Sequence, residues 1–401
     1  MEPDNKKYFY FPKFHLKHFL FIVFFLFTCI KKGIQIVFKL EQKIPIEFIK
    51  LYIYDLGDFL SIIPLIIMKK RLQNNNITDQ NEVNDFKYVA SYYNQRMQKS
   101  KCALFKNIFL FTTIDFIAQI SSVIFYIITT DQKITVTKAN LNSRLIFNVI
   151  VVIICSYFFL HTKIYRHHKL AFLIDLVCLL ILAIIDFIKI FEIKEGISIS
   201  LIYLLIRILN GILYSIDDVV AKIIFLYKYY STYALLVSKS IIDCFYLIIF
   251  SFPFIFIKLE DSNREKKNVF LMIIDVFNDK KYILIFIIYM IISFFYNNLY
   301  LKIIDVFSPN HLIIAKLLEN FGVFIIDLIV NGTDSEENVV IRFIMFILLI
   351  LSSIIYNEYL VINICGLSKN TQLFLDYKEK SDFLSIVSED IISETLELST
   401  L

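Results

Sequence analysis

Apolar segments about twenty residues long alternate along this chain with short charged stretches. A helix needs roughly 20 consecutive apolar residues to cross the hydrocarbon core of a bilayer, so each segment predicts a membrane-spanning helix. We therefore expect an all-α, polytopic integral membrane protein with ten transmembrane helices. The first span is interrupted by Lys31, Lys32 and Gln35, which leaves nine spans as the alternative count. The ten predicted spans are 18–38, 46–68, 108–129, 144–161, 170–190, 197–219, 232–257, 282–301, 310–330 and 340–362.

The lengths of the loops divide the spans into two groups of five. A long polar stretch, 69–106, follows the second span, and another, 258–281, follows the seventh. Because five crossings are an odd number, a second half built like the first would lie inverted in the membrane. The spacing therefore predicts a 5+5 inverted repeat, although no residue-level similarity relates the halves. The predicted regions are an N-terminal cytosolic segment 1–17, a first half 18–190, a second half 197–362 and an acidic cytosolic tail 363–401.

Basic residues near the span ends predict the orientation. The turn between the fourth and fifth spans, 163–169, is rich in Lys, Arg and His. Its counterpart between the ninth and tenth spans carries Asp334, Glu336 and Glu337. By the positive-inside rule, the basic turn and both termini face the cytosol. We expect the protein in an endomembrane (ER, Golgi or vesicle) or in the plasma membrane.

Composition excludes several classes of function. Hydrophobic residues make up 58% of the chain and charged residues only 19%, far from the profile of a soluble domain. The net charge of +4 is divided among the loops, so no nucleic-acid partner is expected. Six cysteines lack CxxC spacing and predict neither a disulfide framework nor a zinc site. The motifs of nucleotide-binding loops, zinc proteases and serine hydrolases are missing, so we expect no enzyme, no cofactor and no metal.

Ionisable residues inside the spans are the main functional signal. A charge at the bilayer centre costs about 2.5 to 3.5 kcal/mol on insertion scales, so such residues usually face a cavity or each other. Polar groups concentrate in the third, sixth and ninth spans. The candidate substrate-binding residues are Asp115, Gln119, Arg207, Asn210, Lys316, Glu319 and Asn320.

Two of these groups have an alternative structural interpretation. Lys316 and Glu319 share one helix face, and either neutralise each other or face the pore as substrate or proton ligands. Arg207 either contacts the solute or pairs with a carboxylate, in which case Asp217 and Asp218 sit at the water interface.

Two further groups are predicted to have no ligand role. Lys239 and Asp243 have i, i+4 spacing and are expected to neutralise each other. His167 and His168 lie in the basic turn with no acidic partner close in sequence. We interpret them as a patch that faces lipid headgroups rather than as a metal site.

Ten spans in five-plus-five order, the basic turn 165–169 and the segment from Arg207 to Lys222 resemble the drug/metabolite transporter superfamily. Its nucleotide-sugar, solute carrier 35-like branch is the nearest, and the resemblance covers roughly residues 16–370. It implies a secondary transporter of a small polar or anionic metabolite, such as a nucleotide sugar or phosphorylated metabolite, that works by alternating access. Arg207 or Lys316 would then meet an anionic group of the solute.

Two other functions stay open at this stage. A non-transporting membrane scaffold or complex subunit would pair all its internal charges. A channel or chemoreceptor-like protein is disfavoured, because seven spans would leave several apolar segments unexplained. The expected partners are the lipid bilayer and a small-molecule solute, and a homodimer stays open.

Overall fold

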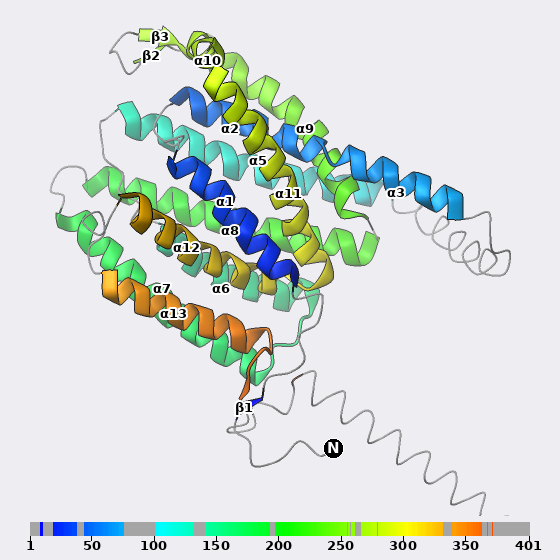
Figure 1. The fold of residues 1–401 in the computed structure, drawn as a ribbon, viewed down its shortest axis with the longest axis vertical. Helices are drawn as coiled ribbons and strands as arrows, with labels where there is room; N and C mark the ends of the chain where they lie inside the picture. Colours follow the sequence, from blue (N-terminus) through cyan, green and yellow to red (C-terminus); the bar gives the residue numbers. More distant parts are fainter. Residues whose placement is uncertain are drawn as a thin grey trace, which may run out of the picture.

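The computed structural model is a bundle of long helices (Figure 1). The expectation of an all-α fold is confirmed in the part of the chain that the structure describes, apart from two short antiparallel strand pairs. The residues described are 9–10, 19–37, 44–75, 101–131, 141–192, 197–228, 230–254, 256, 258–260, 266–278, 280–331, 339–362, 367 and 371.

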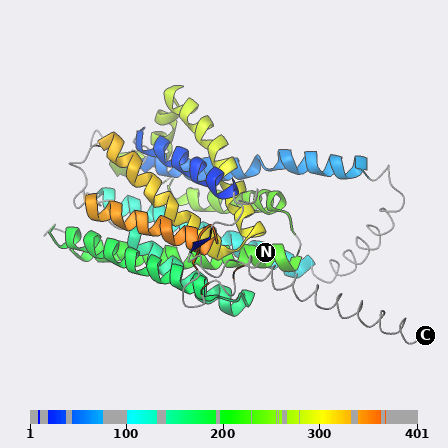
Figure 2. The same cartoon turned by 60° about the horizontal axis from the view of Figure 1, so that its bottom comes forward.

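A helix occupies each of the ten predicted spans, with α2 and α3 together covering the second. The helices of the N-terminal half are α1 (Phe19–Val37), α2 (Ile44–Phe59), α3 (Ile62–Asn75), α5 (Lys101–Asp131), α6 (Leu141–Leu160) and α7 (Arg166–Glu192). Those of the C-terminal half are α8 (Ile197–Lys228), α9 (Thr232–Phe254), α10 (Val269–Asn278), α11 (Lys280–Val306), α12 (Pro309–Asn331) and α13 (Val339–Tyr356). Beyond a turn at Leu60 and Ser61, α3 extends past the end of the bundle (Figure 2).

Six helical segments of the described chain are long and apolar enough to cross a membrane. A shorter apolar helix, Leu145–Leu160, matches the fourth predicted span. Helices α1, α8 and α12 also coincide with predicted spans and carry several of the internal charges. The six segments are Ile49–Met68, Leu104–Ser121, Arg166–Ile185, Thr232–Pro253, Lys280–Val306 and Val339–Tyr356.

The outward faces of the helices fit a membrane-embedded protein. Large apolar side chains are exposed along them, including Ile249 at 70% and Ile329 at 78% exposure. In water such a surface would be strongly unfavourable, whereas in lipid it is the normal exterior of a helix bundle.

The segment 258–281 differs from the polar stretch that its position suggested. Strand β2 (Lys258–Glu260) pairs antiparallel with β3 (Lys266–Asn268), and α10 follows directly. Helix α10 is apolar but only ten residues long, so it is too short to span a bilayer. It packs against α2 and α11 instead.

Each helix of the bundle packs against specific neighbours. Helix α1 packs against α11 and α12, and α8 packs against α5 and α6. Helix α2 contacts α11 and α9, while α9 also contacts α5. Helices α6 and α7 pack together, as do α12 and α13, and the contacts of α7 with α13 and of α6 with α12 join the two halves.

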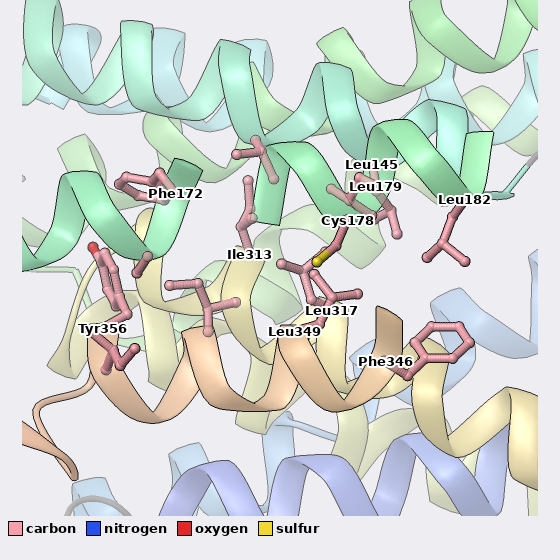
Figure 3. Packing of buried hydrophobic residues seen from close by; sticks show 14 of the residues in the cluster. Leu145, Phe172, Cys178, Leu179, Leu182, Ile313, Leu317, Phe346, Leu349 and Tyr356 are labelled. Carbon is pink, nitrogen blue, oxygen red and sulfur yellow. The ribbon is translucent and has the colours of Figure 1, made fainter. Parts of the chain in front are cut away.

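The main apolar core lies where α6, α7, α12 and α13 meet. Figure 3 shows Leu179 of α7, Leu317 of α12 and Leu349 of α13 pointing toward one another. None of these three side chains is more than 1% exposed. A second core joins α1, α5, α8, α9, α11 and α12, and Tyr296 and Tyr300 of α11 pack against it.

Beyond the bundle, the two ends of the described chain meet. Strand β1 (Phe9–Tyr10), which precedes α1, pairs antiparallel with β4 (Val361–Ile362), which follows α13. The segments before the first helix and after the last one therefore lie at the same end of the bundle.

Candidate functional site

A buried ammonium group on α9 lies within a ring of carboxyl groups. Lys239 Nζ is 2.9 Å from Asp58 Oδ2 of α2, 2.9 Å from Asp115 Oδ2 of α5 and 3.3 Å from Asp243 Oδ2 one turn along α9. The lysine is only 3% exposed. The predicted contact between Lys239 and Asp243 is present, but it is one of three, and the other two tie α9 to the first half of the chain.

Polar side chains hold the carboxyl groups of this ring in place. Asn297 Nδ2 of α11 donates to Asp58 Oδ1, and Gln119 Nε2 donates to Asp115 Oδ2 at 2.7 Å. Asp55, one turn before Asp58, is 3% exposed and interacts electrostatically with Asp243. Its Oδ1 has no hydrogen-bond partner among the described residues.

A second ion pair lies on the helices of the C-terminal half. Lys316 Nζ of α12 lies 3.1 Å from Asp218 Oδ2 of α8 and donates to the Tyr300 hydroxyl of α11 at 2.7 Å. The Tyr300 hydroxyl in turn donates to Asp218 Oδ1. In the described chain Lys316 therefore pairs across helices with Asp218, and the intrahelical pair with Glu319 that its spacing allowed is not formed.

Asp217 links the two groups. It is 3% exposed and interacts electrostatically with Asp115, Asp218, Lys239 and Lys316. Its Oδ1 has no hydrogen-bond partner within the described part of the chain. Asp217 and Asp218 are thus buried in the bundle, and the alternative that placed them at the water interface is wrong.

A third buried cation is surrounded by tyrosine rings. Lys31 Nζ of α1 lies 4.1 Å from the ring centroid of Tyr296, 4.5 Å from that of Tyr54 and 5.8 Å from that of Tyr289. A desolvated ammonium gains about 2 kcal/mol or more over such a ring face. Lys31 also interacts electrostatically with Asp58 and Glu319, so it borders the same region.

These groups form one buried assembly, which we call the central polar network. It draws residues from both halves of the chain and contains six aspartates and three lysines. Its members are Lys31, Tyr54, Asp55, Asp58, Asp115, Gln119, Asp217, Asp218, Lys239, Asp243, Tyr296, Asn297, Tyr300 and Lys316.

The structure brings some of the predicted substrate-binding residues together in the central polar network and places others outside it or at its border. Asp115, Gln119 and Lys316 belong to the network. Asn210, fully buried on α8, accepts a hydrogen bond from Ser121 of α5. The other predicted residues of α12 are Glu319, which borders Lys31, and Asn320, which is 7% exposed. The side chain of Arg207, the seventh candidate, lies outside the described set.

Sequence reasoning missed Lys31 and the tyrosines of the network. Lys31 counted only as an interruption of the first span, yet a lysine within an apolar helix is itself a sign of a buried partner. Asp55 and Asp58 share a helix face near the middle of the second span, which was the available signal for that part of the site. Nothing in the spacing of the tyrosines indicated that their rings would surround Lys31.

In comparisons with known proteins, no family model and no curated protein matches the chain. The fold and the central polar network are therefore the basis for the proposed function.

Proposed function

We propose that this protein is a ten-helix secondary transporter that moves a small polar metabolite by alternating access, with proton or cation uptake at the central polar network. The observation that carries the proposal is the excess of carboxyl groups over ammonium groups among the described side chains of the network. Six aspartates surround three lysines there, and adding Arg207 would not balance them.

An unbalanced set of buried charges cannot stay fully ionised without a further positive charge. Moving isolated carboxylates out of water costs several kcal/mol each even after relaxation, unless a partner compensates. The network must therefore hold protons, or take a cation or a positively charged solute. A scaffold would be expected to pair all its internal charges, whereas Asp55 and Asp217 each leave a buried oxygen without a hydrogen bond in the described chain.

The helix packing supports the repeat that a transporter of this kind requires. Each first-half helix can be exchanged for the one five spans later: α1 for α8, α2 for α9, α5 for α11, α6 for α12 and α7 for α13. The contacts of α1 with α11 and α12 then become those of α8 with α5 and α6. The contact of α6 with α7 becomes that of α12 with α13, and the contact of α2 with α11 becomes that of α9 with α5. Such an exchange is expected of two homologous halves related by a pseudo-twofold axis.

The strand pair β1–β4 supports an even number of crossings. The segments flanking α1 and α13 meet at one end of the bundle, as ten spans require and nine would not allow. Combined with the basic turn at 163–169, this favours both termini in the cytosol. The membrane would be an endomembrane or the plasma membrane.

The network also bears on the class of solute. Lys239 and Lys316 are held by aspartates and Lys31 lies over tyrosine rings, and the six aspartates outnumber these three cations, so the network as a whole does not favour a phosphate group. We therefore favour a neutral or cationic polar solute over the anionic metabolite that the family resemblance implied.

Uptake into proteoliposomes tests the proposal. The purified protein would be supplied with three solute panels, namely amines and amino acids, neutral sugars and nucleosides, and nucleotide sugars with phosphorylated metabolites. Each panel is measured with and without an inward proton gradient and an inward Na⁺ gradient.

We expect at least one neutral or cationic solute to be taken up faster with a gradient, and Asp115→Asn to abolish that acceleration. Lys302→Met is the matched control, because Lys302 pairs with Asp305 at 2.7 Å but is 47% exposed and lies outside the network. Uptake that ignores both gradients, or a folded protein that transports no solute of any panel, would refute the proposal.

A further inference from the structure

A cluster of metal-ligand side chains lies at the junction of α7 and α13, away from the central polar network. His167 Nε2 at the start of α7 is 3.1 Å from Glu358 Oε1, just beyond the end of α13. The ring of His168 lies 4.1 Å from that of His167. One ligand atom of each of the three residues lies within 4.8 Å of those of the other two.

The acidic partner that the sequence around the histidines lacks thus comes from the other end of the chain. His167 is 4% exposed, and neither its Nδ1 nor its Nε2, although the latter lies near Glu358, makes a hydrogen bond within the described chain. A buried imidazole without a hydrogen bond is costly, and a bound metal ion is one way to satisfy it. A patch that faced lipid headgroups would instead be exposed.

The backbone conformation at Glu358 also supports a functional role for this residue. Helix α13 ends in a Schellman motif, in which Tyr359 N–H donates to the Ile354 carbonyl at 3.0 Å and Glu358 N–H donates to the Ile355 carbonyl at 3.2 Å. Glu358 occupies the left-handed position of that motif, with φ of 57°. Glycine is the usual residue there, because a side chain is disfavoured at positive φ. A glutamate kept in this conformation suggests a role for its carboxylate.

Aromatic packing fixes the rest of the cluster. The ring of Tyr356 lies 4.5 Å from that of His168 and 5.1 Å from that of Phe172, which Figure 3 shows beside it. One turn further into the bundle, Ser352 Oγ of α13 donates to the Ala171 carbonyl of α7 at 2.8 Å. The two helix ends that carry the ligands are therefore held together by independent contacts.

We propose that His167, His168 and Glu358 form a binding site for a divalent transition-metal ion of the zinc type. Two imidazole nitrogens and one carboxylate suit Zn²⁺ or Co²⁺, and three protein ligands leave one position of a tetrahedron open. The metal would clamp the start of α7 to the end of α13. Its binding does not depend on the solute or on the proposed function.

Co²⁺ and Zn²⁺ binding to the full-length protein tests the site. The protein is purified in detergent without a polyhistidine tag and stripped with a chelator. We expect one equivalent of Co²⁺ to give the visible absorption bands of a tetrahedral nitrogen and oxygen site, and Zn²⁺ to displace it. Zn²⁺ at about 100 times its Kd should raise Tm by several degrees, because it binds only the folded state.

Four variants make the result specific. His167→Gln and Glu358→Gln should each weaken Co²⁺ binding at least about tenfold, whereas His161→Gln, which removes an exposed histidine outside the cluster, should leave it unchanged. Glu358→Gly removes the carboxylate and also the unfavourable backbone, so it should fold well and yet lose the metal. Wild-type protein without a stoichiometric Co²⁺ site, or a site that survives both Glu358 variants, overturns the proposal.

Discussion

Replacement of Lys239 by Met gives the most direct test of the central polar network. Met keeps most of the length of the lysine stem, so packing changes little while the ammonium group is lost. Asp58, Asp115 and Asp243 then share a low-dielectric site without the cation that lies 2.9 to 3.3 Å from each of them. Removing one partner of a buried ion pair typically costs about 3 to 5 kcal/mol. With three partners, we expect the upper end of that range.

That loss is large against the total stability of a folded protein, which is about 5 to 15 kcal/mol. It should also depend on pH, because protons can replace the missing cation. In the variant the folded state would bind more protons than the unfolded state, so stability should fall as pH rises. Each extra proton bound on folding contributes a slope of about 1.4 kcal/mol per pH unit.

Thermal unfolding followed by far-ultraviolet circular dichroism measures both effects, and the method suits a chain that contains no Trp. Lys302→Met removes an exposed lysine from a pair with Asp305 and should cost less than about 1 kcal/mol. Adding Asp115→Asn to Lys239→Met should recover part of the stability by removing one uncompensated charge. Equal Tm values for Lys239→Met and Lys302→Met at neutral pH would refute the reasoning.

Three further predictions follow from other parts of the structure. Lys316→Met should lower Tm strongly and the double variant with Asp218→Asn should restore most of it, whereas rescue by Glu319→Gln instead would contradict the observed pairing. Gly57→Ala should destabilise the protein by about 1 to 3 kcal/mol, because the new Cβ would lie 2.9 Å from the Met290 carbonyl oxygen of α11. Gly33→Ala is the control, because its Cβ would meet only a side-chain methyl at 3.8 Å, and it should be neutral or stabilising in the same unfolding assay. Asn76 lies in a sequon between α3 and α5, in the stretch 69–106 that is predicted to be cytosolic, and should carry no glycan; a glycosidase-sensitive shift lost in Asn76→Gln would contradict the predicted orientation.

Hydrophobic patterning was enough to predict the helices at the ten spans, because their length and apolar composition are local properties of the chain, but it missed the short helix α10. Spacing along one helix also predicted the contact between Lys239 and Asp243. It could not predict that Asp58 and Asp115 would complete the ring, since they come from other helices and depend on tertiary packing. Spacing along α12 likewise allowed a pair between Lys316 and Glu319. It could not show that Asp218 of α8 would be the actual partner of Lys316.

The proposed metal site could not be predicted from the sequence either, because its residues are far apart along the chain. The two histidines were visible as neighbours in sequence, but their acidic partner follows them by some 190 positions, so no local motif contains all three. Only the packing of α7 against α13 brings them together. The left-handed backbone at Glu358 was equally hidden, because a glutamate gives no sequence signal for positive φ.

The contacts of Lys239 stabilise the fold and would also have to change during the proposed transport cycle. It lies on α9 of the second half, while Asp58 and Asp115 lie on α2 and α5 of the first half. Any rocking of one half against the other must stretch or exchange these two contacts. A proton delivered to Asp115 would weaken one of them by removing its charge, and so lower the cost of the movement. Under the proposed function, the excess of carboxyl groups therefore couples proton uptake to the change of access.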